Sequence, residues 1–473
     1  MQNTLLIWLP VIITLIVLVV LPIGVLVRLR RRYPETKWDW EWTDTSEVAF
    51  PKRFLWGVAT AAHQVEGGCT NNNWSRWENG ATTDGSPHIK TGEVTGTACE
   101  NWTRYPEDIE LIRELGCNAY RMSVEWSKIE PRLGEFDETV LAHYREIILA
   151  LRAAGIEPMV TLHHFTNPLW FEDLGAFEKS ENIKYLVRFS EKVFATLRDQ
   201  VTYWCTLNEP AVYASMGYFM GDFPPGKRSI KLTGTVLKNT LRAHVEIYTA
   251  LKKLPGGDRA KIGLVKNLTQ FDPLRRTFLL DWLIARTLHN LFNTSIYQFL
   301  KTGKFLFSIL GIPIIRYHDD RGKHSNDFIG LNYYSRLLVK FGLRGGLFKF
   351  VMRPDDVKTD MAYAMYPEGI YRALMETSGL NLPIIITENG IADKVDNNRF
   401  PFIRTYLYAV SQAIKEGVDV RGYFYWSLMD NFEWAEGYSM KFGLYAVDFK
   451  TQERTLRAGS EAYRMVIKSA VDG

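Results

Sequence analysis

Two apolar runs of the sequence each carry a glutamate at their end and are then interrupted. The run "VTYWCTLNE" ends in Glu209, directly before Pro210, and "PIIITENG" places Glu388 just before Asn389 and a glycine. Runs of this composition predict buried strands, which would aim their last side chains rigidly. A pair of carboxyl groups presented in this way suits the hydrolysis of a glycosidic bond, in which one group is protonated and the other ionised.

Two other uses of these glutamates are less well supported. A metal site would need further Asp or His residues at ligand spacing, and none accompanies Glu209 or Glu388. The four cysteines fall at no metal-ligand spacing, and the chain is too long to need a disulfide framework. A structural ion pair is the other alternative. The sequence therefore favours a catalytic pair that uses no metal and no cofactor.

Eight short apolar runs, separated by helical patterns, are the elements that would position the pair. Their nearly continuous hydrophobicity is typical of parallel strands covered on both faces. Between residues 51 and 473 they predict an α/β fold, a single (β/α)8 TIM barrel. A doubly wound sheet is the alternative, but no Gly-rich phosphate loop follows the first run. The runs are "FLWGVATAA", "AYRMSVEW", "EPMVTLHH", "VTYWCTLNE", "KIGLVKN", "DFIGLNYY", "PIIITEN" and "VRGYFYWSL".

Polar or aromatic residues close seven of these eight runs. The carboxyl ends of the strands form the rim of the active site in a (β/α)8 barrel, so these side chains should meet at one mouth. The fourth and seventh strands would lie nearly opposite each other, which lets Glu209 and Glu388 face each other. The residues at the ends are His63, Gln64, Glu125, His163, His164, Asn208, Glu209, Asn332, Tyr333, Tyr334, Glu388, Asn389 and Trp426.

These residues and their surroundings resemble glycoside hydrolase family 1, the retaining β-glycosidases. "TLNEP" and "ITENG" are similar to the two catalytic signatures of that family. "FLWGVATAAHQVEGG", "YRMSVEW", "DFIGLNYYS" and "YWSLMDNFEWAEGYSMKFGLYAVDF" resemble further stretches in the same order, from residue 52 to 465. Phe165 stands where the family commonly has tryptophan, which leaves the preference for the leaving group open.

The resemblance implies a role for ten residues. Glu209 is the expected general acid/base and Glu388 the expected nucleophile. Arg121 and Tyr334 are expected to keep the nucleophile ionised and oriented. The residues expected to bind the sugar are Asn208 at its 2-hydroxyl, Gln64, His164, Glu433 and Trp434 at its other hydroxyls, and Trp426 beneath its ring.

The first thirty-two residues predict a membrane anchor with a basic flank. Residues 4–27 contain no charged side chain and, at about 1.5 Å per residue, are long enough to cross a bilayer core of about 30 Å. A cleaved signal peptide is the alternative, but the preceding "MQN" has no basic residue. Arginines at 28, 30, 31 and 32 then predict that the following residues lie in the cytoplasm. The expectation is a single-pass membrane protein that contacts the lipid bilayer through residues 4–27.

The chain thus divides into an anchor at 1–32, a connector at 33–50 and a glycosidase domain at 51–473. The tryptophans of the connector either pack on the domain as an edge strand or lie in the lipid headgroup layer. The formal net charge of +4 equals the charge of the basic flank, so the domain has no basic field for nucleic acid. Nothing in the sequence indicates the oligomeric state.

Three functions are consistent with these features. The first is a membrane-anchored retaining β-glycosidase that hydrolyses β-linked glucosides or galactosides, with glycolipids among its substrates. The second is a glycolipid transglycosylase, because the anchor resembles that of the plant galactolipid galactosyltransferase, a relative within the same family. The third is a non-catalytic sugar-binding homologue, which the presence of both glutamates disfavours.

Overall fold

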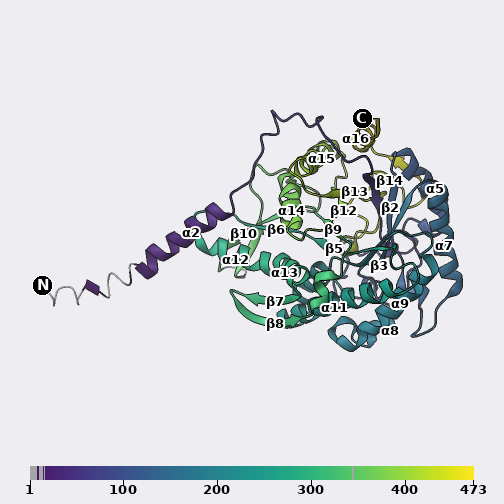
Figure 1. Cartoon of the computed structure of the whole chain (residues 1–473), viewed down its shortest axis with the longest axis horizontal. Coiled ribbons are helices and arrows are strands. Elements are labelled where there is room, and N and C mark those ends of the chain that lie inside the picture. The colour runs from purple at the N-terminus through teal and green to yellow at the C-terminus, as the bar shows by residue number, and fades with distance from the viewer. Residues whose placement is uncertain (1–7, 10–13, 15, 344–345, 473) are drawn as a thin grey trace.

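Eight parallel strands close into a barrel at the centre of the molecule (Figure 1). The structure is a computed structural model that describes residues 8–9, 14, 16–343 and 346–472. The strands follow the order β1-β13-β12-β9-β5-β4-β3-β2 around the barrel, which confirms the predicted (β/α)8 architecture. The strands are β1 (Leu55–Ala59), β2 (Ala119–Ser123), β3 (Glu157–His163), β4 (Tyr203–Asn208), β5 (Lys261–Asn267), β9 (Phe328–Asn332), β12 (Ile384–Asn389) and β13 (Val420–Trp426).

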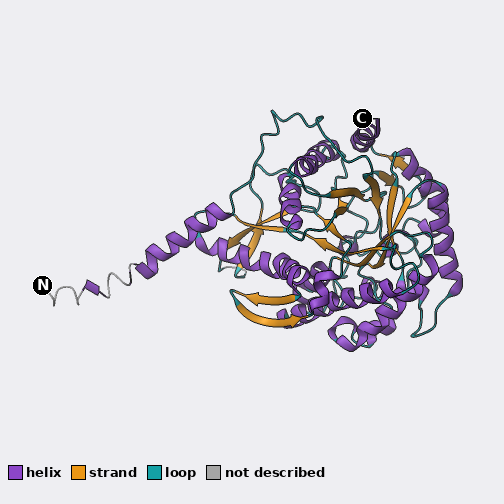
Figure 2. Cartoon of the chain, viewed as in Figure 1, coloured by secondary structure: helices purple, strands orange, loops and turns teal. Residues whose placement is uncertain are grey.

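Helices surround the barrel and cover the outer faces of its strands (Figure 2). Helix α9 (Ile183–Leu197) shows the reason, because its apolar residues recur at three-to-four spacing and bury Leu186, Phe189 and Val193. Burying each such side chain contributes about 1.5–3 kcal/mol. The other long helices are α5 (Asn101–Glu114), α7 (Glu138–Ala153), α11 (Ile230–Lys253), α12 (Leu279–His289), α13 (Ser295–Thr302), α14 (Glu368–Ser378), α15 (Arg399–Lys415) and α16 (Glu461–Asp472).

Shorter helical segments connect these elements. The short α-helices are α3 (Ala62–Val65), α4 (Asn73–Glu78), α6 (Trp126–Ile129), α8 (Leu169–Asp173) and α10 (Pro210–Ser215). The π-helical segments are η1 (Ile16–Val20), η4 (Met216–Met220) and η5 (Asn290–Thr294). The 3-10 turns are η2 (Ala176–Glu178), η3 (Ser180–Asn182), η6 (Asp320–His324), η7 (Trp434–Glu436) and η8 (Ala458–Ser460).

Three small sheets are built from strands outside the barrel, in the segments that follow β5, β9 and β13. Strand β10 pairs in parallel with β6 and antiparallel with β11, and it begins four residues after β9 ends at Asn332, so it continues from the mouth of the barrel. The other two sheets are hairpins. The strands are β6 (Gln270–Pro273), β10 (Arg336–Phe341), β11 (Phe348–Val351), β7 (Lys304–Ile309), β8 (Ile312–His318), β14 (Tyr445–Val447) and β15 (Arg454–Leu456).

The predicted membrane span is wrong, and with it the prediction of a single-pass membrane protein with a cytoplasmic barrel. In the part of the chain that the structure describes, no helix combines the length and the apolar character that crossing a bilayer requires. Of the predicted span, the described residues 16–20 form the π-helical segment η1, and residues 21–27 belong to the helix that follows it. Helix α2 (Leu21–Arg32) then continues into its arginines. Residues 4–7, 10–13 and 15 of the predicted span lie outside the described residues.

The connector follows α2 and runs along α14 and α15 without forming an edge strand. Trp38 packs against Tyr371 and Tyr408, with ring centroids 5.2 and 6.0 Å apart. Further along, the backbone N–H of Ala49 donates to the hydroxyl of Ser411 at 2.9 Å. The connector is therefore fastened to the outside of the barrel at several points.

Candidate active site

Eight of the ten predicted site residues line one cavity at the carboxyl ends of the barrel strands. The other two, Arg121 and Gln64, lie behind the cavity wall, where they bond to Glu388 and Glu433. The eight lining residues are His164, Asn208, Glu209, Tyr334, Glu388, Trp426, Glu433 and Trp434.

The turn between β4 and α10 positions Glu209. Strand β4 ends at Asn208, and α10 begins at Pro210, which suits the first helical position because it has no N–H to satisfy. Glu209 has a φ of +43°, a left-handed conformation that costs a non-glycine residue about 1–3 kcal/mol. Phe165 and Trp434 line the same cavity with φ of +68° and +48°. Such strain is typical of functional sites, where the direction of a side chain matters.

Glu388 is held by two charged or polar donors. Arg121 donates to Oε1 at 2.5 Å, and the hydroxyl of Tyr334 donates to Oε2 at 2.7 Å. Arg121 is completely buried; burial lowers its pKa, but its acidic neighbours, Glu388 first among them, together raise the pKa above its usual value. Charge-assisted bonds of this kind fix both oxygens of an ionised carboxylate. Glu388 is therefore arranged as a nucleophile would be.

Glu209 has a different environment. Its Oε1 accepts from the side-chain amides of Asn267 at 3.0 Å and Asn332 at 2.7 Å. Burial, and then the negative charge of Glu388, raise the pKa of Glu209 to about 7. A carboxyl group with this pKa is partly protonated near neutral pH, which is the state a proton donor needs.

Asn208 connects one hydrogen-bond partner of Glu388 with one of Glu209, and it orients a histidine. Its Oδ1 accepts from Arg121 at 2.8 Å and from Asn332 at 3.2 Å, so its amide nitrogen donates to Nε2 of His164 at 3.0 Å. Burial, and then the charge of Arg121, hold the pKa of His164 well below its usual value, so the ring is neutral and Nδ1 carries the hydrogen. That N–H has no partner among the described residues. It is a free donor for a ligand in the cavity.

Gln64 and Glu433 add further polar atoms at the other side of the site. The amide of Gln64 donates to the carbonyl of Phe432 at 2.8 Å and to Glu433 at 3.3 Å, while its own Oε1 has no partner in the described structure. Burial, followed by the charge of Glu388, raises the pKa of Glu433 to about 8. A protonated Glu433 offers a ligand both a donor and an acceptor.

Apolar and aromatic side chains complete the cavity. They come from segments that follow the strand ends, including helix α10 and strand β10, and therefore form its outer part, of which only Phe165 was considered in the sequence. Phe165, Val212, Phe223, Leu337, Met361, Tyr363 and Phe442 belong to this group.

The role of the fifth strand was not predicted either. The run "KIGLVKN" was the one whose end we did not assign to the rim, yet its last residue, Asn267, bonds to Glu209. The same signal, an apolar run that ends in a polar residue, would have found it. The preceding Lys266 is fully buried on the other face of β5, and its ammonium donates to Asn293 at 2.8 Å.

Several polar strand ends support the scaffold instead of lining the cavity. His163 contacts Asn167 at 2.8 Å, and the hydroxyl of Tyr333 donates to the carbonyl of Tyr366 at 3.1 Å. The strand-end residues outside the lining are His63, Gln64, Glu125, His163, Asn332, Tyr333 and Asn389.

Among the described residues, His63, Cys69 and Glu125 form the one group whose potential metal-ligand atoms all lie within 4.8 Å of one another. His63 contacts Thr95 through Nε2 at 3.0 Å, and Glu125 accepts from Thr166 at 3.0 Å. These ligand atoms already take part in hydrogen bonds within the protein. Their arrangement fits a buried polar network better than a metal site.

Comparison with known proteins identifies clear relatives. The sequence profile of glycosyl hydrolase family 1 matches residues 46–471. β-Glucosidase A of Thermotoga maritima is 36% identical over 446 residues, which cover 89% of this chain and 98% of that protein. A 1,4-β-D-glucan glucohydrolase of Thermotoga neapolitana is 35% identical, with the same coverage of 89% and 98%. The structure of a β-glycosidase from Pyrococcus horikoshii has a TM-score of 0.79 at 38% identity, and the match covers 89% of this chain and 96% of that one.

Proposed function

The chain belongs to glycosyl hydrolase family 1 and is a glycoside hydrolase, and from this premise we propose that it is a retaining β-glucosidase with Glu209 and Glu388 as its catalytic pair. One observation carries the proposal: two buried carboxyl groups of one cavity have different environments. Arg121 and Tyr334 donate hydrogen bonds to the two oxygens of Glu388, whereas burial, and then the charge of Glu388, raise the pKa of Glu209 to about 7. Two carboxyl groups set to different protonation states are what glycoside hydrolysis requires.

In the first step Glu388 attacks the anomeric carbon while Glu209 protonates the glycosidic oxygen. The bond between that carbon and oxygen breaks, the leaving group departs as an alcohol, and the sugar becomes an ester of Glu388. Arg121 and Tyr334 orient the attacking carboxylate through their hydrogen bonds.

In the second step Glu209, now ionised, removes a proton from a water molecule. The resulting hydroxyl group attacks the anomeric carbon and displaces Glu388, which regains its negative charge. Two inversions at one carbon return the β configuration. Asn267 and Asn332 hold the carboxyl group of Glu209 in place through both steps.

The remaining predicted residues would bind the sugar. The free Nδ1–H of His164 and the unpaired Oε1 of Gln64 are a donor and an acceptor that no described protein group satisfies. Because buried polar atoms normally have partners, these two support a role in binding hydroxyl groups. Trp426 lines the cavity beside His164, with ring centroids 5.9 Å apart, and would support the face of the sugar.

We favour glucose as the sugar because two similar proteins are named β-glucosidase A and 1,4-β-D-glucan glucohydrolase. Transfer to the hydroxyl group of a second sugar would use the same glycosyl ester. Product analysis with and without an added alcohol acceptor distinguishes hydrolysis from such transfer.

Replacing the nucleophile tests the proposal. Glu388→Gly should abolish hydrolysis of an aryl β-glucoside, and added azide should restore turnover by entering the space that the carboxylate leaves. Because azide then attacks from the side of Glu388, the product should be the α-glucosyl azide. The matched variant Glu209→Gly should give the β-azide instead, since its glycosyl ester still forms. The β-azide from Glu388→Gly, or an α-sugar as the first product of the unsubstituted protein, would show that the assignment is wrong.

A further inference from the structure

The outer wall of the cavity is built from two segments that follow β9. Leu337 belongs to β10, whereas Met361 and Tyr363 belong to the segment 353–366. The hydroxyl of Ser335 joins the two segments by donating to the carbonyl of Ala364 at 2.5 Å. The two segments therefore form one wall.

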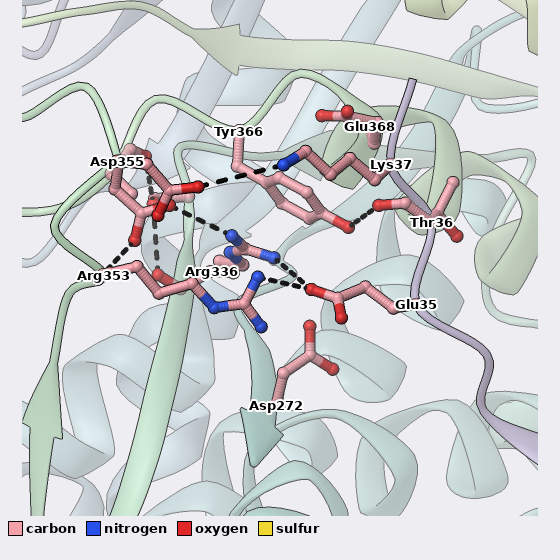
Figure 3. A network of polar contacts seen from close by, with 12 residues as sticks. Glu35, Thr36, Lys37, Asp272, Arg336, Arg353, Asp355, Tyr366 and Glu368 are labelled. Atoms are coloured by element: carbon pink, nitrogen blue, oxygen red, sulfur yellow. Dashed lines mark hydrogen bonds and ion pairs between the residues drawn. The ribbon is translucent and has the colours of Figure 1, made fainter. Parts of the chain in front are cut away.

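The connector before the barrel contacts residues of both segments, and Figure 3 shows Glu35 and Thr36 beside Arg336, Arg353 and Tyr366. The carboxylate of Glu35 lies 2.6 Å from Arg353 and 3.7 Å from Arg336. The carbonyl of the next residue, Thr36, accepts from the hydroxyl of Tyr366 at 2.8 Å. Arg353 and Tyr366 mark the two ends of the segment 353–366, so the connector holds that segment at both ends.

Arg336 brings the connector close to the cavity itself. It lies between Ser335 and Leu337, both of which line the cavity, while its own side chain points back toward Glu35. The guanidinium is almost completely buried, lies 4.0 Å from the centre of the Tyr366 ring and pairs with Asp356 at 3.1 Å. Arg336 therefore connects Glu35 to the wall, and a shift of Glu35 would reach the wall through this residue.

A second contact fixes the connector in this position. The buried carboxylate of Glu368, at the start of α14, accepts from the backbone N–H of Trp38 at 2.8 Å and from the indole of Trp40 at 3.1 Å. Trp38 also packs on Tyr371 of the same helix. Buried, charge-assisted bonds are more rigid than exposed ion pairs, and they keep Glu35 and Thr36 opposite the wall.

We propose that residues 35–40 of the connector brace the wall that contacts the leaving group and so help to select substrates by their leaving group. The inference rests on the proposed function, in which the sugar lies deep beside Glu388 and the leaving group extends outward past Leu337 and Met361. Such a brace should affect kcat/KM for substrates with long leaving groups, which reach the outer wall. It should have no effect on kcat/KM for substrates with short ones.

A matched pair of double variants in the full chain tests the brace. Glu35→Gln with Trp38→Ala removes the charge that pairs with Arg353 and the ring that packs on Tyr371. Glu41→Gln with Trp42→Ala makes the same chemical changes at exposed residues of the same connector, where Trp42 is 82% exposed. For each protein, kcat/KM is measured on methyl β-glucoside and on cellotetraose. Hydrogen exchange of the segment 353–366 is followed in parallel, because it requires no turnover.

The brace predicts that Glu35→Gln/Trp38→Ala lowers kcat/KM for cellotetraose by about threefold to tenfold, leaves that for methyl β-glucoside within about twofold, and speeds exchange in 353–366. The control variant should match the unsubstituted protein in all three measurements. Unchanged exchange overturns the proposal, and so does an equal fall on both substrates. Faster exchange in a protein that hydrolyses neither substrate would refute the proposed function and leave the brace standing.

Discussion

The carboxyl group of Glu209 accepts hydrogen bonds from two neutral amides, whereas that of Glu388 accepts one from a guanidinium. Amide donors offset only part of the cost of burying a charge, and a cation offsets much more. Burial therefore raises the pKa of Glu209 despite the hydrogen bonds that Asn267 and Asn332 donate to it.

At the residue scale we predict that kcat/KM falls as the pH rises through about 7. Burial, and then the charge of Glu388, raise the pKa of Glu209 from 4.5 to about 7, and the reaction needs the protonated form. The profile is measured on methyl β-glucoside, whose poor leaving group depends on the acid. Asn332→Ala removes a bond that favours the ionised form and should move this limb to higher pH. A limb that ends below pH about 5.5 would contradict the assignment of Glu209 as the acid.

At the scale of elements, the layer between β5 and η5 contains a buried lysine. Lys266 is completely inaccessible, its ammonium donates to Asn293 at 2.8 Å, and it lies 4.7 Å from the centre of the Phe292 ring. Burial lowers the pKa of Lys266 to about 7, against the weaker opposing effect of Glu376 and Glu209. Burying a charge at Lys266 therefore makes the packing of β5 against η5 less favourable.

We predict that Lys266→Met changes how stability depends on pH. The folded pKa of about 7 lies below the usual value of 10.5, so the unfolded chain binds the proton more tightly. The stability of the unsubstituted protein therefore gains from this group as the pH rises from about 7 to about 10.5. The Tm difference between the variant and the unsubstituted protein should shift in favour of the latter over this range. Lys261→Met, at an exposed position of the same strand, is the control, and an equal slope for both variants would contradict the prediction.

At the scale of the whole molecule, the segment before the barrel has two parts with different roles. Helix α2 extends away from the body beside α12, and none of its residues is buried (Figure 1). The connector that follows is fastened through Glu35, Thr36 and Trp38. The connector therefore contacts the wall of the cavity directly, through Arg353 and Tyr366.

We predict that removal of residues 1–32 leaves Tm and kcat/KM nearly unchanged, whereas removal of residues 1–42 lowers kcat/KM for cellotetraose. The physical reason is that the first deletion removes an exposed helix and the second removes the contacts of Glu35 and Trp38 with the barrel. Both proteins are compared with the full chain by calorimetry and steady-state kinetics. A clear loss of Tm in the shorter deletion would show that α2 supports the fold.

The sequence by itself determined the barrel, because strand and helix periodicity depends on neighbouring residues only. It also predicted that Glu209 and Glu388 would meet in one cavity, since each lies at the end of an apolar run and the barrel brings such ends together. The ten predicted site residues follow from the same local signals together with the family resemblance. Their placement around one cavity agrees with that prediction, and their chemical roles stay a proposal.

Only the tertiary structure decided which distant residues meet. The bond from Asn267 to Glu209 and the contact of Glu35 with Arg336 join residues that no local pattern connects. The membrane prediction failed because hydropathy counts apolar residues, whereas a span requires one long apolar helix, and the described residues contain no such helix. The local sequence specifies helices and strands, whereas the contacts between residues far apart in the sequence depend on how the whole chain folds.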